Sequence, residues 1–312
     1  MLELKELSKT YGKVNALKNV SVTINEGESV AFLGPEGSGK STVFRIATSL
    51  TPATEGTVIL NGQDIKDDSI RVREDIGFLP QTNPLYGEML LYDYFRYVAR
   101  LKGIPRANVR GSIKVIEETT GLIDQLNVVI GDMNRQTKRL AGIAQALLGD
   151  PKVLFIDAPY EGLEDEEIEV VETLIKSISK KRTVCVATDK LDTAIALSDR
   201  LVIMHKGQIV EDGTTDSLLV KEASLARLVL VVKGPNPEEF TEIIQKIKGV
   251  QDTERITTRK PEMTGLEITA QADPNLKQLL KDTVAEQEEW ELVRIGRKTL
   301  DLPGIYDRLT SV

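Results

Sequence analysis

The spacing of hydrophobic and polar positions divides the first part of the chain into alternating strands and helices. Short apolar runs predict buried strands at residues 29–33, 57–60, 76–81, 153–157, 184–188 and 200–204. Hydrophobic residues at helical spacing predict helices from 85 to about 125, at 137–148 and at 165–179. Because strands and helices alternate, we expect an α/β fold with a largely parallel sheet. The helices at about 85–135 are expected to be an insertion into that sheet.

The pattern changes near Lys221. Strands are predicted at 225–233, 254–258, 266–270 and 291–296, with helices at 237–247 and 276–290 and a closing helix at 303–309. The order β-α-β-β-α-β is the split pattern of a ferredoxin-like domain. We therefore expect two domains: residues 1–220 form the α/β domain, and residues 221–312 form a ferredoxin-like α+β domain with a regulatory or dimerisation role.

A glycine-rich segment between the strand at 29–33 and the following helix carries the first chemical signal. It matches the pattern G-x-x-x-x-G-K-[ST] in the strand-loop-helix context that a phosphate loop requires. Its backbone N–H groups and the helix N-terminus are suited to bind phosphate. Lys40 would reach the outer phosphates and the Ser41 hydroxyl would bind Mg²⁺. The candidate nucleotide-binding residues are Gly34, Pro35, Glu36, Gly37, Ser38, Gly39, Lys40, Ser41 and Thr42.

Composition narrows the classes of function. The net charge of -8 argues against a nucleic-acid-binding protein, which would need a basic face. Cys185, the one cysteine, lies in an apolar run, so it predicts plain packing in a reducing compartment. The one histidine, His205, lies before the turn at 206–207 and is expected at the surface. No apolar run approaches the ~20 residues of a membrane span, so we expect a cytoplasmic protein.

The order of these features resembles the ATP-binding subunit of ABC transporters, from Met1 to about Gly213. The resemblance depends on Tyr11 before the loop, Gln81 after it, the strand ending in Asp157 and the segment at 206–214. The run 76–86 is similar to subunits of the drug-export and gliding-motility type. The resemblance implies an ABC-type P-loop fold, ATP and Mg²⁺ as ligands, a homodimer or heterodimer, and separate transmembrane subunits. It implies a location on the inner face of the cytoplasmic membrane, through that partner.

The resemblance also implies roles for single residues. Tyr11 is similar to the aromatic residue that stacks on adenine. Gln81 resembles the glutamine that contacts Mg²⁺ and the attacking water and whose loop meets the membrane subunit. Asp157 resembles the aspartate that holds Mg²⁺ through water. Ser41, Gln81 and Asp157 form the expected metal site, and Tyr11 belongs to the expected nucleotide-binding residues.

Two positions depart from the family pattern where it serves catalysis. The family places a glutamate directly after the strand-ending aspartate, as general base, and this chain has Ala158. After the next strand the family places a histidine that contacts the γ-phosphate, and this chain has Asp189. An acid there would disfavour the negatively charged transition state. No catalytic residue is therefore assigned.

The signature loop departs as well. Counting back from 144–147 places it at Met133, Asn134, Arg135, Gln136 and Thr137, where the family has Leu-Ser-Gly-Gly-Gln. Gln136 replaces a glycine at a position where the backbone must approach the phosphate closely. The side chains of Asn134 and Arg135 can still contact a phosphate. The following loop, 161–164, is also altered. The offset of Glu161 and Glu164 from Asp157 argues against either as a replacement base.

The sequence therefore leaves two main hypotheses. The first is an ATP-binding subunit of an ABC-type membrane complex that binds ATP at a dimer interface with weak or absent hydrolysis. The alternative is an active transport ATPase that drives export through a separate membrane subunit. A third hypothesis, loss of ATP binding, follows from the acidic Glu36 within the phosphate loop.

Overall fold

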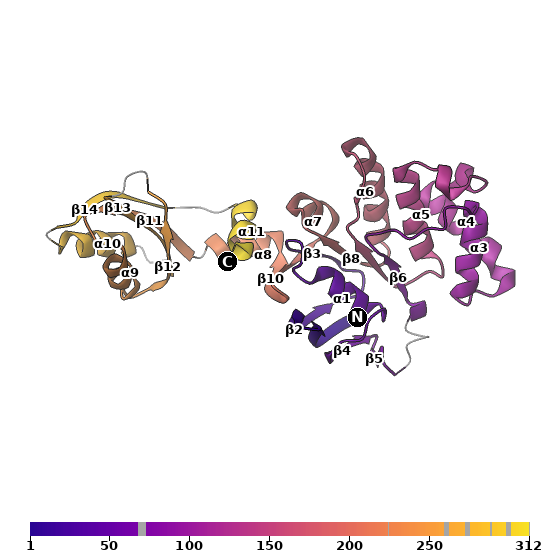
Figure 1. Cartoon of the computed structure of the whole chain (residues 1–312), viewed down its shortest axis with the longest axis horizontal. Coiled ribbons are helices and arrows are strands. Elements are labelled where there is room, and N and C mark those ends of the chain that lie inside the picture. Colours follow the sequence, from indigo (N-terminus) through magenta and orange to yellow (C-terminus); the bar gives the residue numbers. More distant parts are fainter. Residues whose placement is uncertain are drawn as a thin grey trace. The chain divides into compact units, whose positions relative to one another are not determined.

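The computed structural model describes residues 1–67, 73–223, 225–258, 262–271, 275–287, 289–297 and 301–311 (Figure 1). Contacts within the chain separate two units. The first unit comprises Met1–Thr215 together with Tyr306–Val312, and the second comprises Asp216–Ile305. The sequence placed the boundary between residues 220 and 221, so the structural division lies earlier and assigns the last residues to the first unit.

The central sheet of the first unit has six strands in the order β10-β9-β3-β8-β7-β6. Their bounds are β3 Ser29–Leu33, β6 Ile76–Leu79, β7 Val153–Asp157, β8 Thr183–Thr188, β9 Arg200–His205 and β10 Gln208–Thr214. Neighbours pair in parallel except β9 and β10, which form an antiparallel hairpin. Every residue of β3, β7 and β8 is buried, as expected for strands covered on both faces. The carboxyl ends of these strands therefore meet at one edge.

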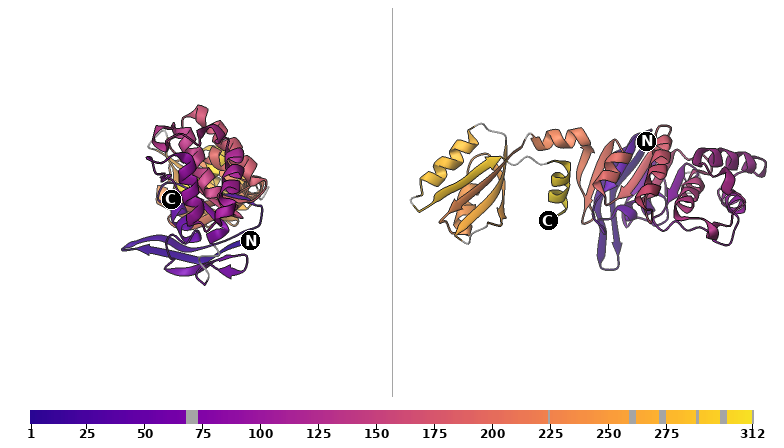
Figure 2. Two further views of the ribbon diagram at one scale, coloured as in Figure 1. Left: turned by 90° about the vertical axis from the view of Figure 1, so that its right-hand side faces the viewer. Right: turned by 90° about the horizontal axis from the view of Figure 1, so that it is seen from above.

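A second, antiparallel sheet has the order β2-β1-β4-β5. Its strands are β1 Leu2–Tyr11, β2 Val14–Ile24, β4 Glu55–Leu60 and β5 Gln63–Asp64. Helix α1, Lys40–Ala47, contributes to the same hydrophobic cluster as both sheets. Within that cluster, Phe44 meets Phe32 and Phe155 edge to face. The β1–β2 hairpin extends beyond the body of the first unit (Figure 2).

Helices surround the central sheet and build a second hydrophobic cluster with β6, β7 and β8. They are α3 Leu91–Leu101, α4 Arg106–Thr120, α5 Arg135–Leu147, α6 Asp165–Ser179 and α7 Leu191–Leu197. Helices α3 and α4 fall inside the segment 85–135 that the sequence predicted to be a helical insertion. Helix α8, Thr215–Ala223, was not predicted, because its hydrophobic positions do not form a clear helical face. Among the described residues, no helix has both the length and the hydrophobicity to cross a bilayer.

The second unit is an antiparallel sheet with two helices. Its strands are β11 Leu225–Lys233, β12 Val250–Ile256, β13 Met263–Gln271 and β14 Glu291–Arg297, in the order β12-β13-β11-β14. Helices α9 Pro237–Gln245 and α10 Leu276–Ala285 pack on the sheet around Phe240. The element order follows the sequence prediction, although β12 begins earlier and α10 ends earlier than expected. Helix α11, Leu302–Thr310, closes the chain.

Candidate nucleotide-binding site

The phosphate loop lies between β3 and α1, and two of its glycines are required by close packing. A Cβ atom on Gly34 would lie 2.2 Å from the carbonyl oxygen of Met204. Gly39 has a φ of 105°, and a Cβ there would lie 2.8 Å from the carbonyl oxygen of Ala16. The loop is therefore held between the β1–β2 hairpin and the end of β9 in a conformation that larger residues would strain.

Lys40 is buried at the base of this loop, with 9% of the residue exposed. Its Nζ donates to the carbonyl oxygens of Gly34 (2.6 Å) and Pro35 (2.8 Å) and to Ser38 Oγ (3.2 Å). Burial lowers the pKa of Lys40, and the nearby carboxylates of Asp189, Asp157 and Glu36 act in the opposite direction. The ammonium group is thus a cation enclosed by carbonyl oxygens and faced by three acids.

Asp157 ends β7 beside the first turn of α1, with 6% of the residue exposed. Burial raises the pKa of Asp157, while a hydrogen bond from the Ser41 hydroxyl and the charges of Lys40 and Arg45 lower it. A carboxylate and a hydroxyl form the hard oxygen donor set that Mg²⁺ prefers, with water and phosphate oxygens completing the shell. The described residues contain no cluster of three or more His, Cys, Asp or Glu able to hold a metal by themselves. The pair therefore fits Mg²⁺ that arrives with a nucleotide.

Ala158 and Asp189, which the sequence analysis expected to occupy the base and switch positions, lie together. Ala158 and Asp189 both line a cavity of about 60 Å³, with Tyr160 and Thr193 among its other walls. Ala158 has a φ of 49°, and its N–H donates to the Ala187 carbonyl oxygen at 2.9 Å. The loop after β7 is thereby tied to β8 in a left-handed conformation.

Asp189 receives one further contact, from the last helix. The Tyr306 hydroxyl on α11 donates to the backbone carbonyl oxygen of Asp189 at 3.4 Å. Burial and the neighbouring Asp189 charge raise the pKa of Tyr306. Tyr306 belongs to the first unit, so the last helix contacts the segment that carries Asp189. The sequence analysis did not anticipate this contact.

Gln81 follows β6 and is exposed, and its side chain is directed to a residue that the sequence had excluded. Its Nε2 donates to Glu161 Oε2 at 3.3 Å. The offset of Glu161 from Asp157 argued against it as a replacement base; the turn after β7 places its carboxylate beside Gln81. The structure therefore brings Ser41 and Asp157 together, whereas Gln81 contacts Glu161.

Tyr11 lies at the end of β1, next to the hairpin turn, and 43% of it is exposed. The Lys9 ammonium lies 5.0 Å from the centre of the Tyr11 ring and donates to the Pro52 carbonyl oxygen at 2.6 Å. The paired strand β2 contacts the phosphate loop at Gly39. The hairpin thus links the loop to an exposed aromatic ring, and adenine stacking on that ring stays a prediction.

The signature segment 133–137 forms the start of α5. Asn134 caps the helix, because its Oδ1 accepts from the Thr137 N–H at 2.7 Å. Arg135 Nη1 lies 3.5 Å from Glu164 Oε1, and both side chains are exposed. Arg135 and Gln136 of this segment therefore contact the start of α6.

Two predictions about single residues have different outcomes. His205 is not a turn residue at the surface, because β9 continues through it and leaves it half-buried. Cys185 lies within β8 and is fully buried, as expected for a packing role. Burial raises the pKa of its thiol.

The sequence analysis also missed Arg139 on α5. This residue is 2% exposed, and its guanidinium donates to backbone carbonyl oxygens in the loops after β6 and β7. Its partners are main-chain atoms, so no residue type in the sequence identifies them. A basic residue on the buried face of a predicted helix was the available signal.

Comparison with known proteins identifies the same region. The family model described as ABC transporter matches residues 17–161. The uncharacterized ABC transporter ATP-binding protein YxlF of Bacillus subtilis is 34% identical over 218 residues, which is 70% of this chain and 72% of that protein. The rat ATP-binding cassette sub-family A member 17 is 26% identical over 316 residues, but this chain spans only 18% of its length.

A solved structure gives the same fold. It is the dimeric ATP-binding cassette MJ0796, in a post-hydrolysis state bound to ADP and Pi. The TM-score is 0.62 at 27% identity, and the match covers 69% of this chain and 98% of that one.

Proposed function

We propose that this chain, which belongs to the family of ABC transporter ATP-binding proteins, binds Mg–ATP at a dimer interface and hydrolyses it slowly or not at all. One contrast carries the proposal. The groups that hold a nucleotide, Lys40, Ser41 and Asp157, are assembled at the edge of the sheet. The adjoining cavity contains a methyl group at Ala158 and an acid at Asp189, in place of a proton acceptor and an imidazole.

Retention of binding is supported by the phosphate loop. The loop keeps the glycines that close packing requires, and its lysine is buried among acceptors that phosphate oxygens can replace. Glu36 adds an acid to the charges that face Lys40, but bound Mg²⁺ would offset that charge. We therefore prefer the hypothesis that the chain binds ATP to the hypothesis that ATP binding has been lost.

Weak hydrolysis follows from the missing groups. A general base contributes ~10²–10⁴ to a rate. Electrostatic stabilisation of the transition state contributes a further ~10²–10³. A methyl group at residue 158 cannot accept a proton, and the Asp189 carboxylate repels the negative charge that develops on the phosphoryl group. The two losses act on the same step.

Two measurements on the purified chain test the proposal. Mg–ATP should raise the melting temperature, and Lys40→Ala should remove that rise, because a ligand that binds only the folded state stabilises it. Phosphate release should stay at the background rate of Lys40→Ala. Release well above that background would refute slow hydrolysis, and a melting temperature that ATP does not change would refute binding.

An active transport ATPase is the second candidate, and one contact favours it. Glu161 brings a carboxylate within 3.3 Å of the Gln81 amide, the side chain that the family pattern assigns to the attacking water. If Glu161 serves as the proton acceptor, Glu161→Gln should abolish phosphate release and leave the ATP-dependent rise in melting temperature unchanged.

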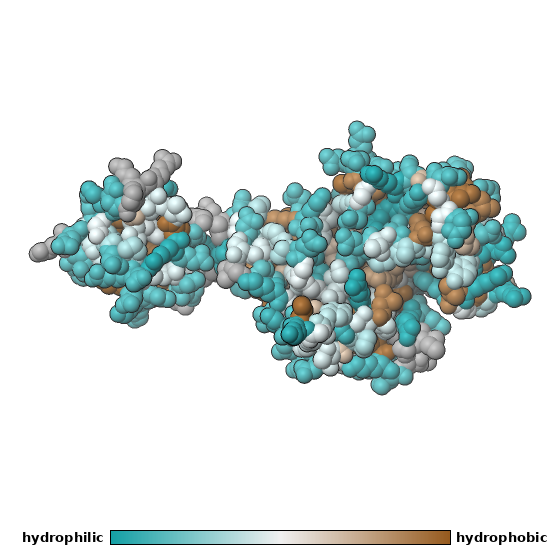
Figure 3. All heavy atoms as spheres, viewed as in Figure 1, coloured by the Kyte–Doolittle hydropathy of each residue, from teal (hydrophilic) through white to brown (hydrophobic). Residues whose placement is uncertain are grey.

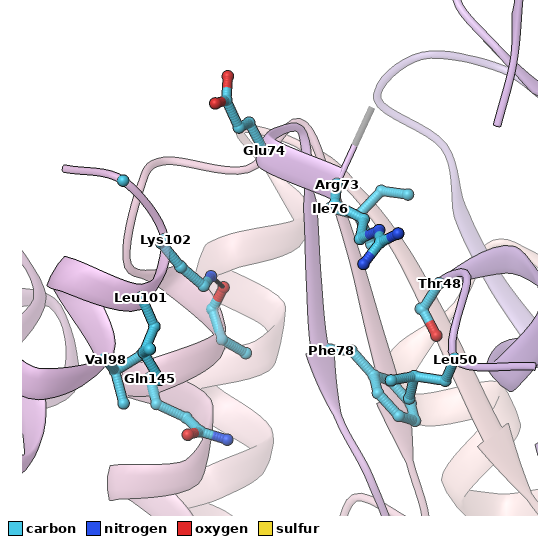
Figure 4. A pocket seen from close by; sticks show the side chains of 12 residues that line it. Thr48, Leu50, Arg73, Glu74, Ile76, Phe78, Val98, Leu101, Lys102 and Gln145 are labelled. Carbon is cyan, nitrogen blue, oxygen red and sulfur yellow. Dashed lines mark hydrogen bonds between the residues drawn. The ribbon is translucent and has the colours of Figure 1, made fainter. Parts of the chain in front are cut away.

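We further propose a docking groove for a separate transmembrane subunit. A cavity of about 510 Å³ lies between the end of α1, strand β6, the end of α3 and the last turns of α5 (Figure 4). Leu50 and Phe78 line one wall, and Val98 and Leu101 line the opposite wall. In Figure 3 hydrophobic surface on the viewed face occurs mainly on the first unit. An apolar groove bordered by polar groups suits a short amphipathic helix, which we assign to the membrane partner.

That partner would place the chain at the inner face of the cytoplasmic membrane. The dimer would be completed by a second copy or a related ATP-binding subunit, and a relative of this fold is itself described as dimeric. Because the signature segment is altered, a phosphate bound by the opposite subunit would meet Asn134 and Arg135. For the second unit we propose a ferredoxin-like module that braces this dimer or regulates it, supported by its strand order.

A further inference from the structure

Arg139 is a buried cation whose donors all reach main-chain oxygens. Its Nε donates to Pro159 O (2.9 Å), its Nη2 to Asp157 O (2.8 Å) and Ala158 O, and its Nη1 to Gln81 O (3.3 Å) and Pro80 O (3.4 Å). A guanidinium carries five N–H donors in a rigid fork. The five carbonyl oxygens therefore match its full donor capacity.

The five oxygens belong to two loops that leave neighbouring strands. Residues 80–81 follow β6, and residues 157–159 are the last residue of β7 and the two that follow it; β7 pairs in parallel with β6. Arg139 itself lies on α5, the helix that begins at the signature segment and ends beside the groove, where Gln145 and Ala146 line its wall. One side chain thus joins both loops to this helix.

A second set of contacts fixes the same loop to the same helix. Asn83 Nδ2 donates to the Lys138 carbonyl oxygen on α5 at 2.8 Å. A Cβ atom on Gly142 would lie 2.0 Å from Asn83 Oδ1, so the helix needs glycine there for the loop to approach. The loop 80–83 is therefore seated on α5 over more than one turn of the helix.

The environment of Arg139 keeps the link rigid. Burial lowers its pKa to about 10, and Glu161 and Asp157 oppose that shift, so the side chain stays charged at neutral pH. A buried charge is costly unless its hydrogen bonds are made. Movement of either loop away from α5 would leave a buried cation and buried carbonyl groups without partners.

We propose that Arg139 is a positioning residue that makes loop 80–83, loop 157–159 and helix α5 move as one unit. Asp157 would contact bound Mg–ATP, and the far end of α5 lines the groove for the membrane subunit. When nucleotide binds at the end of β7, the hydrogen bonds of the Arg139 guanidinium then couple that binding to the loop after β6 and to the wall of the groove. The nucleotide part of this inference rests on the proposed function, whereas the link between the loops does not.

Hydrogen exchange followed by mass spectrometry on the full chain tests the link without nucleotide. We expect Arg139→Gln to speed exchange in peptides covering 80–83 and 157–161 together, by about tenfold or more. Arg139→Lys keeps the charge but offers a compact ammonium that cannot serve both loops, so it should free at least one of them. The matched control is Arg182→Gln, which also removes a hydrogen bond from a guanidinium to a carbonyl oxygen, that of Pro151, and should leave both peptides unchanged.

The second arm repeats the exchange with Mg–ATP. In the wild type both loops should gain protection together, and in Arg139→Lys protection should stay confined to 157–159. If Arg139→Lys exchanges like the wild type in both arms, or if the wild-type loops respond independently, the inference is wrong. If ATP does not raise the melting temperature of the wild-type chain, the proposed function is wrong and the experiment with Mg–ATP no longer applies. The exchange experiment without nucleotide still decides whether Arg139 links the two loops.

Discussion

Ala158→Glu, alone and combined with Asp189→His, tests whether the site lacks only its proton acceptor and its switch residue. Ala158 already has a φ of 49° and donates its N–H to Ala187. A left-handed residue costs roughly 1–2 kcal/mol whether its side chain is short or long, so the substitution adds little backbone strain. The new side chain would enter the cavity of about 60 Å³ that Asp189 also lines.

The expected magnitude depends on the acids that face this cavity. Two carboxylates about 4–6 Å apart repel each other by about 3–4 kcal/mol at an effective dielectric constant of ~20. Because 1.36 kcal/mol corresponds to one pKa unit, each of Asp157 and Asp189 at such a distance would raise the pKa of the introduced carboxyl group by about two to three units. With both acids ionised its pKa would lie above the usual range for a glutamate, and it would accept protons well only above that raised pKa.

The double variant removes one of these repulsions and supplies an imidazole at the switch. We expect it to raise phosphate release by ~10²–10⁴ over the wild type, the usual contribution of a general base. Ala158→Glu alone should gain less, because Asp189 still opposes charge on the phosphoryl group. The rise of rate with pH should lie at lower pH in the double variant, since the introduced carboxyl group would lose the Asp189 repulsion.

The assay is phosphate release from Mg–ATP between pH 6 and 9, with Lys40→Ala added to each variant as the background. Thermal stabilisation by ATP shows separately that each variant still binds the nucleotide. A double variant that binds ATP like the wild type and releases no more phosphate would refute the reasoning. The same holds for a wild-type chain that already turns over rapidly.

Three further predictions follow from single side chains. Lys40→Ala should remove the stabilisation that Mg–ATP gives, which amounts to about 2.7 kcal/mol at one hundred times the dissociation constant, as measured by urea unfolding with and without ATP. Leu101→Asp should abolish capture of the transmembrane subunit without lowering the melting temperature, because 69% of this groove residue is exposed; binding that persists would remove the groove from the proposal. Burial lowers the pKa of Lys102 to about 8, so the unfolded chain binds more protons between about pH 8 and 10.5 and the free energy of unfolding should rise with pH across that window. Lys102→Met should flatten this rise in urea titrations, and an unchanged slope would contradict the burial argument.

The sequence predicted those parts of the site that depend on local pattern. The phosphate loop, the strand ending in Asp157 and the helix predicted at 137–148, which begins at Arg135, each combine a hydrophobic period with a specific residue type. Their positions could therefore be predicted to within about two residues without a structure. The order of elements in the second unit could be predicted for the same reason. Boundaries were less accurate, as at β12, where charged residues of an exposed strand conceal its start.

The remaining contacts join residues that are distant in the chain. The Gln81–Glu161 hydrogen bond depends on two loops at one sheet edge, and the contact of Tyr306 with the Asp189 carbonyl group depends on the return of the last helix. Neither pairing leaves a local pattern. Arg139 was the hardest to predict, because its acceptors are carbonyl oxygens that every residue has. Offset along the sequence could not predict the contact of Glu161 with Gln81, because the turn after β7 determines what the side chain meets.

Under the proposed function, the charges at the site explain how this chain would bind ATP without turning it over. The cation of Lys40 lies under the loop, and the Ser41–Asp157 pair is suited to Mg²⁺. Both therefore attract the bound nucleotide before the reaction starts. Asp189 acts from the other side, where the family pattern places a group that stabilises the transition state. Catalysis requires interactions that strengthen as the reaction proceeds. Attraction from Lys40 and Mg²⁺ lowers the energy of the bound state, whereas repulsion from Asp189 grows with the charge on the phosphoryl group. Such a distribution favours a nucleotide that stays bound and closes a dimer over one that is consumed.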